Sequence, residues 1–288
     1  YTRPEIDRSG IISVKNCRHP VVERFLDGGY FVPNDCLLDG NANRLMLITG
    51  PNMAGKSTYM RSVALCVILA QAGCFVPAAQ ARIGVVDRVF TRVGASDDLA
   101  SGNSTFMLEM TEVADILKNA TPKSLIIYDE IGRGTSTYDG MSIARAVVEY
   151  TSGSIRAKTL FATHYHELTE LEGTTDGVVN YNIAAKKRGN DVVFLRTIGR
   201  GAADDSYGIE VAHLAGVPDA VVKRAKQILA SLPEDTRLSA ARGDDCSDNI
   251  SFDSISEQKV IERIKEIDIN TLTPYEAITL LYELKKEL

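Results

Sequence analysis

A glycine-rich segment in the first quarter of the chain carries residue types that bind phosphate. It runs from Gly50 to Thr58 as Gly-Pro-Asn-Met-Ala-Gly-Lys-Ser-Thr, after the apolar run 45–48 and before a helical pattern. The spacing G-x-x-x-x-G-K-[ST] is that of a phosphate loop, whose backbone N–H groups and helix N-terminus surround phosphate oxygens. We predict that Lys56 contacts the β- and γ-phosphates of a nucleotide and that Ser57 binds Mg²⁺. The alternative is a glycine-rich turn that only caps a helix.

Two adjacent carboxylates, Asp129 and Glu130, follow a second β-prone run at 124–128. At the end of a strand, Asp129 could hold Mg²⁺, and Glu130 could orient or deprotonate an attacking water molecule. Alone, the pair could equally well cap a turn. Together with Lys56 and Ser57, it indicates a nucleotide hydrolase.

A histidine follows a third expected strand, at 159–162. The segment His164-Tyr-His-Glu167 could suggest zinc, but the H-E-x-x-H pattern fails because Glu170 stands where the second histidine is needed. We expect His164 to contact the γ-phosphate or the attacking water. The alternative is a loop histidine with a structural role.

Small residues at 100–106 lead into an expected helix, 104–119, with Ser104 or Thr105 as its N-cap. The partial positive charge at this helix end could meet the γ-phosphate of a nucleotide held by another subunit. The Gly- and Thr-rich loop 132–140 could sense the nucleotide. For Arg133, a structural or interface role is favoured over that of an arginine finger.

The remaining pattern alternates strands with helices and predicts an α/β fold with a parallel sheet covered on both faces. Ligands bind at the carboxyl ends of such strands, where the phosphate loop, Asp129 and His164 all fall. The expected elements are strands at 10–14, 28–33, 45–48, 85–93, 124–128 and 159–162, and helices at 56–72 (ended by Gly73), 104–119 and 138–151.

The character of the sequence changes beyond residue 200. Two helices are expected at 206–215 and 219–232, then a Ser- and Asp-rich flexible linker, then amphipathic helices near the C-terminus. The second helix is predicted to bury one apolar face, made of Val221, Val222, Ala225, Ile228, Leu229 and Leu232.

The composition of the 288 residues, 44% hydrophobic and 24% charged, is that of an ordinary soluble protein. A formal net charge of −6 argues against nucleic-acid binding by this chain alone. Five scattered cysteines, without a C-x-x-C pair, favour reduced thiols inside a cell. We find no membrane span or signal peptide, and the missing initiator Met suggests a piece of a longer chain.

Four motifs in order resemble those of the MutS family of DNA mismatch-repair ATPases. They lie at 49–58, 97–107 (Asp-Asp-Leu-Ala-Ser-Gly-Asn-Ser-Thr-Phe-Met), 129–140 and 162–165 (Ala-Thr-His-Tyr). The resemblance covers nearly the whole chain, and its last stretch is similar to the C-terminal helix of bacterial members. It implies a P-loop NTPase of the ABC-ATPase type with a C-terminal helix-turn-helix appendage.

The resemblance also implies composite sites in a homodimer that binds ATP or ADP with Mg²⁺. Glu130 and His164 would be catalytic, Ser57 and Asp129 would bind the metal, and Ser104 would act on the nucleotide of the partner subunit. Phe31 matches the position that stacks on adenine. The implied nucleotide contacts within one subunit are Phe31, Gly50, Pro51, Asn52, Met53, Ala54, Gly55, Lys56, Ser57 and Thr58.

The implied organisation divides the chain into consecutive segments. They are an N-terminal β flank (1–48), a P-loop ATPase core (49–200), a helix-turn-helix dimerisation element (201–232), a flexible linker (233–257) and a C-terminal helical segment (258–288). Family members carry mismatch-reading domains ahead of this region, so mismatched DNA would be bound only through domains missing here. A MutL-type repair partner, a bacterial cytoplasm with nucleoid association, and no membrane are expected.

Some features leave alternatives open. Ala54 replaces a frequent glycine of the family, which is tolerable if its φ is negative. A transporter or chromosome-structural ABC ATPase is one alternative, but 101–105 departs from the Leu-Ser-Gly-Gly-Gln type of signature. A nuclease-linked MutS paralogue is another, and the run Phe106-Met-Leu-Glu-Met110 favours the mismatch-repair branch instead.

Overall fold

The computed structural model describes residues 1–26, 29–51, 53–94, 104–188, 191–202 and 207–231. All of them belong to the first of two units of the chain, Tyr1–Gly243. The predicted linker, 233–257, and the predicted C-terminal helical segment, 258–288, lie outside the described residues.

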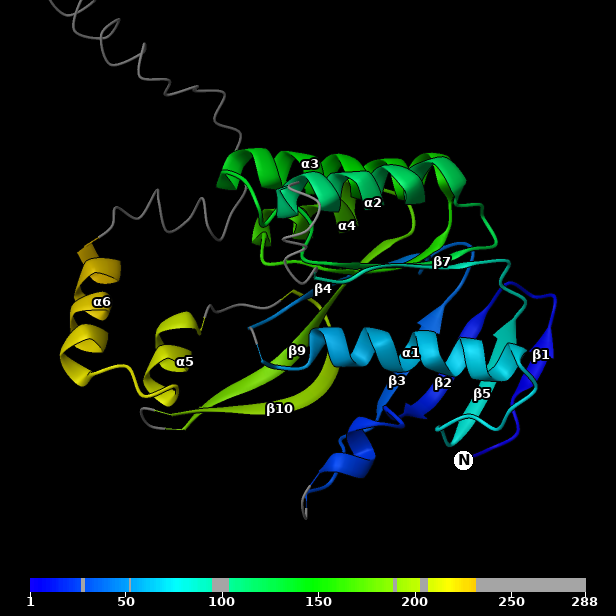
Figure 1. The fold of residues 1–288 in the computed structure, drawn as a ribbon, viewed down its shortest axis with the longest axis horizontal. Coiled ribbons are helices and arrows are strands. Elements are labelled where there is room, and N and C mark those ends of the chain that lie inside the picture. The colour runs from blue at the N-terminus through cyan, green and yellow to red at the C-terminus, as the bar shows by residue number, and fades with distance from the viewer. Residues whose placement is uncertain (27–28, 52, 95–103, 189–190, 203–206, 232–288) are drawn as a thin grey trace, which may run out of the picture. The chain divides into compact units, whose positions relative to one another are not determined.

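A six-stranded sheet forms the centre of the fold (Figure 1). Its order is β10-β9-β4-β8-β7-β6, and all neighbouring strands are parallel except β9 and β10. The prediction of a wholly parallel sheet is therefore wrong at one edge, where a long antiparallel hairpin was missed. The strands are β4 (Leu45–Thr49), β6 (Val89–Arg92), β7 (Leu125–Asp129), β8 (Lys158–Ala162), β9 (Val178–Arg188) and β10 (Asp191–Arg200).

The central strand β4 is apolar on both faces because both faces of the sheet are covered. Met46 and Ile48 pack in one hydrophobic cluster with α1 (Lys56–Gln71), and Leu45 and Leu47 pack in another. The second cluster includes residues of α2 (Thr105–Asn119), α3 (Thr137–Tyr150) and α4 (Leu171–Thr174). Figure 1 shows α1 on one side of the sheet and α2, α3 and α4 on the other. The predicted coverage of both faces is confirmed.

A four-stranded sheet in the order β1-β5-β2-β3 packs on the α1 side and closes the first cluster. The strand predicted at 28–33 is wrong, because β3 begins only after Pro33, which has no N–H to donate to a ladder. Strand β5 was not predicted. The strands are β1 (Glu5–Asp7), β2 (Ile12–Cys17), β3 (Asn34–Leu38) and β5 (Gln80–Gly84).

The predicted helix ends agree closely with the structure. Gly73 follows α1 with a φ of 81°, and Ser104 caps α2 by accepting a hydrogen bond from the Met107 N–H at 3.1 Å. The strand expected at 85–93 shortens to β6. Short helical turns fill the connections: η1 (Val22–Phe25), η2 (Thr151–Ile155) and η3 (His166–Glu170).

Two helices, α5 (Gly208–Leu214) and α6 (Asp219–Ser231), follow the β9–β10 hairpin. Among the described residues, the predicted apolar face of α6 is only partly buried. Val222 is buried, but Val221, Ile228 and Leu229 remain 55%, 47% and 47% exposed, and Leu232 lies outside the described residues. These three side chains are therefore largely uncovered among the described residues.

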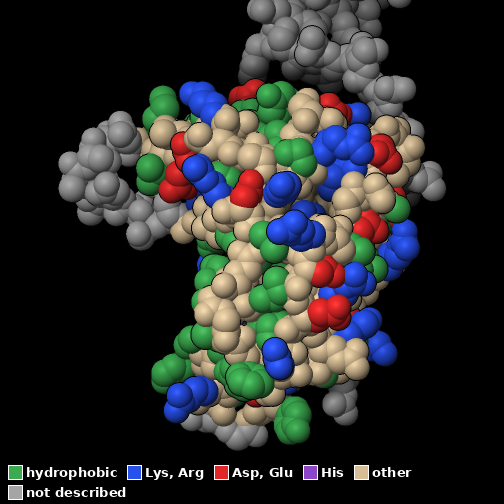
Figure 2. Space-filling model, turned by 90° about the vertical axis from the view of Figure 1, so that its right-hand side faces the viewer, with side chains coloured by type: hydrophobic (Ala, Val, Ile, Leu, Met, Phe, Trp, Pro, Cys, Tyr) green, Lys and Arg blue, Asp and Glu red, His purple; other side chains and the backbone are tan. Residues whose placement is uncertain are grey.

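Charged side chains are mixed in sign over the face of the molecule at the β1 and β5 end. Figure 2 shows Lys and Arg interspersed there with Asp and Glu. Within the described residues, no helix combines the length and the hydrophobicity needed to cross a membrane.

The packing of β4 predicts how the fold responds to truncation of its side chains. Leu47 is fully buried, so Leu47→Ala should lower the free energy of unfolding by about 2–5 kcal/mol. Leu37→Ala, on the 48% exposed leucine of β3, is the control and should cost less than about 1 kcal/mol. Urea denaturation followed by circular dichroism measures both, and equal losses would contradict this account of the core.

Candidate active site

Parallel pairing brings the predicted site residues to one edge of the sheet. Ile48 of β4 and Asp129 of β7 both pair with Ala162 of β8. Hydrogen bonds continue this alignment past the strand ends, from the Glu130 N–H to the Ala162 carbonyl (3.0 Å) and from the Thr163 N–H to the Ile48 carbonyl (3.1 Å). The three connections that leave this edge carry the phosphate loop, Glu130 and His164.

The loop between β4 and α1 has the backbone that a phosphate nest needs. Gly50, Met53 and Gly55 adopt positive φ values of 130°, 67° and 106°. At Gly50 an added Cβ would lie 3.2 Å from the Ile183 carbonyl oxygen, so both conformation and space favour glycine. Ala54 is buried and its φ is negative, so alanine can replace the glycine that is frequent at this position.

Lys56 begins α1 and is only 4% exposed. Its ammonium group donates hydrogen bonds to the carbonyls of Gly50 (2.6 Å) and Pro51 (3.3 Å) and lies 3.8 Å from Glu130 Oε1. Burial lowers the pKa of Lys56, while the negative charges of Glu130 and Asp129 oppose that shift. A buried cation surrounded by a glycine-rich loop is well placed to receive an anion.

Glu130 lies at the centre of the site. Its Oε1 accepts a hydrogen bond from His164 Nε2 at 2.5 Å, and its Oε2 accepts one from the Arg133 guanidinium at 2.5 Å. Burial would raise the pKa of this carboxyl, but the His164 hydrogen bond and the charges of His164, Lys56 and Arg133 outweigh it, so the net pKa is lowered. Glu130 is therefore held as a carboxylate at neutral pH.

The backbone of Glu130 is strained. Its φ of 58° lies in the left-handed region, which non-glycine residues occupy at a cost of about 1–3 kcal/mol. Such strain persists only where the surrounding structure holds it, and it is concentrated at functional sites. The strain and the convergent donors single out Glu130 among the acidic residues of this edge.

Asp129 and Ser57 supply the kind of oxygen atoms that Mg²⁺ prefers. Both line a pocket of about 510 Å³ together with Glu130. Asp129 is 8% exposed, and its buried Oδ1 has no hydrogen-bond partner. Among the described residues no cluster of three or more His, Cys, Asp or Glu could hold a metal alone. One carboxylate and one hydroxyl, completed by phosphates and water, nevertheless fit the usual needs of Mg²⁺.

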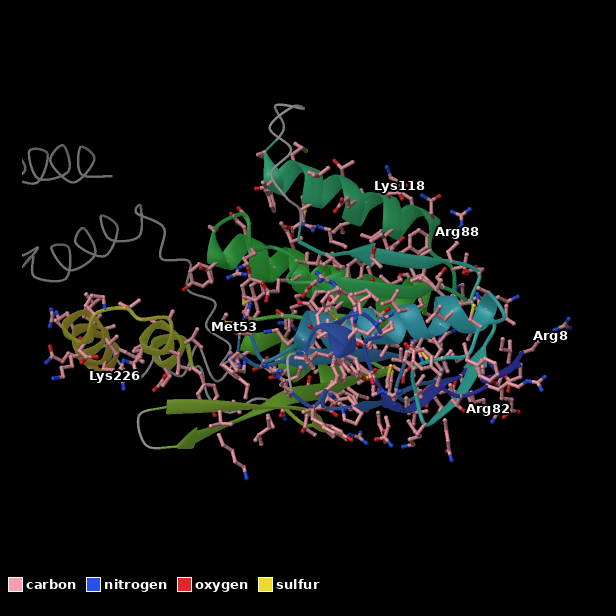
Figure 3. All side chains as sticks on the ribbon, turned by 60° about the horizontal axis from the view of Figure 1, so that its bottom comes forward. Arg8, Met53, Arg82, Arg88, Lys118 and Lys226 are labelled. Atoms are coloured by element: carbon pink, nitrogen blue, oxygen red, sulfur yellow. The ribbon has the colours of Figure 1, made fainter. Side chains whose placement is uncertain are left out.

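A second pocket, of about 270 Å³, opens on the other side of the phosphate loop. Phe31 lines it together with Met53, Ala54, Gly55 and Thr58. Figure 3 shows Met53 at the N-terminal end of α1, with Arg8 and Arg82 far away by β1 and β5. The structure thus brings Phe31 next to the loop, and its stacking on a base stays a prediction.

Two residues of the predicted nucleotide site stay untested by the described structure. Ser104 is exposed at the start of α2, and although its neighbour Thr105 lines the pocket of Ser57 and Asp129, the nucleotide contact of Ser104 needs a second subunit. It stays a prediction. Asn52 lies outside the described residues.

The sequence reasoning missed other residues of this site. Tyr165 donates to the Gly132 carbonyl, and Glu109 accepts from the Gly132 N–H. Arg133, for which a structural or interface role was favoured, pairs with Glu130. One signal for Glu109 was present. It is a carboxylate on the apolar face of α2, between Phe106 and Val113, where a charge needs a specific partner.

Comparisons with known proteins agree with this geometry. Residues 46–233 match the family model of MutS domain V, and residues 255–287 match that of the DNA mismatch repair protein MutS C-terminal region. The chain is 56% identical to the DNA mismatch repair protein MutS of Caldicellulosiruptor bescii and 55% identical to that of Acetivibrio thermocellus, with all of this chain and 34% of each relative covered. Identity to the MutS of Clostridium kluyveri is 54%, with all of this chain and 35% of the relative covered.

The chain thus spans about a third of the length of these relatives. Each of them is named a mismatch repair protein, as the run 106–110 had favoured, and not a transporter or a nuclease-linked paralogue. The domain V match alone covers more than half of the chain. The chain belongs to the MutS family of DNA mismatch repair proteins and corresponds to the C-terminal region of its members.

Proposed function

We propose that this chain binds ATP with Mg²⁺ and hydrolyses it to ADP and phosphate. The observation that carries the proposal is the Glu130 carboxylate, held between His164 and Lys56 at the end of the sheet where the phosphate loop begins. Membership of the MutS family supports the same conclusion.

Nucleotide binding would use groups that the loop already gathers. Phosphate oxygens would take the place of the Gly50 and Pro51 carbonyls that now accept from Lys56, and backbone N–H groups of the loop would bind them as well. Ser57 and Asp129 would hold Mg²⁺, which supplies neutralisation of charge on the β- and γ-phosphates. Phe31 would stack on adenine in the neighbouring pocket.

Hydrolysis would depend on Glu130 as the group that orients a water molecule. The water oxygen attacks the γ-phosphorus, the bond to the bridging oxygen of ADP breaks, and a water proton passes to Glu130 or onward to the phosphate. His164 holds Oε1 of the carboxylate by its hydrogen bond and so fixes the direction in which Glu130 accepts. Lys56 stabilises negative charge on the transferred phosphoryl group.

The site would be completed in a homodimer of the ABC-ATPase type. Ser104 and the N-terminus of α2 would meet the nucleotide of the partner subunit, which agrees with their exposure. The α5–α6 pair, within the segment 201–232, would serve as a helix-turn-helix dimerisation element. The exposed apolar residues Val221, Ile228 and Leu229 of α6 support that role. The β flank, 1–48, and the core, 49–200, would form the rest of each subunit.

In the whole protein, ATP binding would close this dimer and release it from a mismatch as a sliding clamp. Mismatched DNA would be held by other domains, because this chain carries a net charge of −6 and mixes both signs on the face in Figure 2. A MutL-type repair protein would be the partner in the cytoplasm of a bacterium, with association with the nucleoid.

The phosphate-loop assignment predicts that Lys56→Ala loses tight ATP binding. Removal of one charged donor to phosphate should raise the dissociation constant for ATP by about tenfold to a hundredfold. Isothermal titration calorimetry with ATP and Mg²⁺ measures this, with Lys118→Ala on the far end of α2 as the control. Unchanged affinity in Lys56→Ala would remove the assignment.

The role of Glu130 predicts a separation of binding from turnover. Glu130→Gln should bind ATP about as tightly as the parent but hydrolyse it roughly 10²–10⁴-fold more slowly, because the amide cannot take up a proton. Single-turnover hydrolysis measures the rate, and Glu170→Gln, an exposed acid that does not line the pocket of Asp129 and Glu130, serves as the control. Hydrolysis by Glu130→Gln at the parent rate would place the base elsewhere.

A further inference from the structure

Gly132 is a junction that the proposed mechanism does not use. Its N–H donates to Glu109 Oε1 of α2 at 2.6 Å, and its carbonyl accepts from the Tyr165 hydroxyl at 2.9 Å. Its φ is 88°, and a Cβ at this position would collide with the backbone of Gly140 at the start of α3. The N–H and the carbonyl of Gly132 are thus each hydrogen-bonded to a side chain from a different part of the fold. Only glycine fits at this position, because of its positive φ and the lack of space for a Cβ.

Glu109 is itself anchored inside the protein. It is 5% exposed, and its Oε2 lies 3.2 Å from the guanidinium of Arg92, which is 4% exposed at the end of β6. The Nε of Arg92 also lies 3.1 Å from Glu112, one turn further along α2. Glu112 is 41% exposed. Both acids therefore pair with Arg92, but only Glu109 accepts a hydrogen bond from the Gly132 N–H.

Gly132 connects the residues that we assign to catalysis with α2 of the same subunit, the helix whose N-terminus we expect to contact the partner's nucleotide. Gly132 follows Glu130 by two positions, and Tyr165 directly follows His164. Glu109 lies little more than one helical turn from Ser104, at the N-terminus of the same helix α2. A displacement of α2 would therefore pull on the backbone that carries Glu130.

We propose that Glu109 is a positioning residue for hydrolysis. Through the Gly132 N–H, it fixes the backbone of Glu130 in its own subunit against α2, the helix whose N-terminus faces the nucleotide of the partner. This inference rests on the proposed ATPase function and adds a physical link between the two composite sites. A link of this kind lets occupancy of one site alter the rate at the other.

A purely structural role for Glu109 would give a different result. A buried ion pair that only supports the fold would lower stability when it is broken, and loss of either acid would disturb Arg92. Glu109 lines the same pocket as Ser57 and Asp129, but both of its carboxylate oxygens are already engaged, one by the Gly132 N–H and one by Arg92. A positioning role therefore lowers the turnover number much more than it lowers ATP affinity.

The first experiment compares Glu109→Ala with Glu112→Ala in the dimeric protein. We expect the kcat of Glu109→Ala to fall about tenfold or more, as for groups that orient a catalytic residue, while its dissociation constant for ATP changes less than about twofold. Glu112→Ala should keep the parent kcat. Equal kcat values for the two variants, or a loss confined to ATP affinity, would overturn the proposal.

Tyr165→Phe covers the case in which Glu109→Ala fails to fold. It removes the other hydrogen bond to Gly132 without leaving a cavity, and we expect kcat to fall severalfold with ATP affinity unchanged. Glu109→Gln keeps an acceptor for the Gly132 N–H and should recover most of the parent kcat. A parent-like kcat in Tyr165→Phe, together with no recovery in Glu109→Gln, would contradict the junction.

The second experiment asks in which subunit Glu109 acts. Each variant is mixed with an excess of Lys56→Ala subunits, which have an intact α2 but cannot load ATP, and hydrolysis is compared with parent subunits mixed in the same way. Glu109→Ala should stay slow, because its loaded site contains its own misplaced Glu130. Recovery to the level of the parent mixture would mean that Glu109 acts only across the interface, and the proposal would be lost.

Ser104→Ala provides the test of the underlying function in the same assay. Its loaded site would receive an intact Ser104 from the Lys56→Ala partner, so its activity should recover. Failure of Ser104→Ala to recover would contradict the composite site itself. That outcome is distinct from recovery of Glu109→Ala, which would contradict only the positioning role.

Discussion

The register of three parallel strands is the constraint on which the site depends. Ile48, Ala162 and Asp129 lie in one row across β4, β8 and β7, so the chain leaves all three strands at the same edge. Hydrogen bonds from Glu130 and Thr163 extend the row beyond the strands. A shift of one residue in this pairing would turn each strand over and separate the carboxylates from the phosphate loop.

Charge concentrated at this edge must be balanced locally. Lys56 is almost fully buried and Glu130 has strained backbone, so each would be costly alone. Their proximity, the hydrogen bond from His164 and the ion pair with Arg133 offset these costs. The buried Oδ1 of Asp129 has no hydrogen-bond partner in this network, and a hard cation such as Mg²⁺ would supply one.

The parts that sequence could predict are those encoded locally. The phosphate loop, the acid pair and His164 each stand at or just past the end of a short apolar strand, and Gly73 and Ser104 mark helix ends by their own chemistry. The β9–β10 hairpin pairs locally, and its signal, Gly189-Asn190 between two β-prone runs, was overlooked. Strand β5 was missed because its pairing partners, β1 and β2, are distant in the chain. Glu109 was missed for the same reason, since its partners Arg92 and Gly132 lie on other elements. The exposure of the α6 side chains and of Ser104 is a property of the folded chain that the local sequence pattern does not show.

The central claim is an ATPase whose site is completed by a second subunit. The most direct test is the specific ATPase activity of the purified chain across a wide range of protein concentration, with Glu130→Gln as the blank. The account predicts a specific rate that rises with concentration and reaches a plateau as dimers form, because Ser104 must come from the partner. A specific rate that stays constant from far below to far above the dimer dissociation constant would show a self-sufficient monomeric site and contradict the claim.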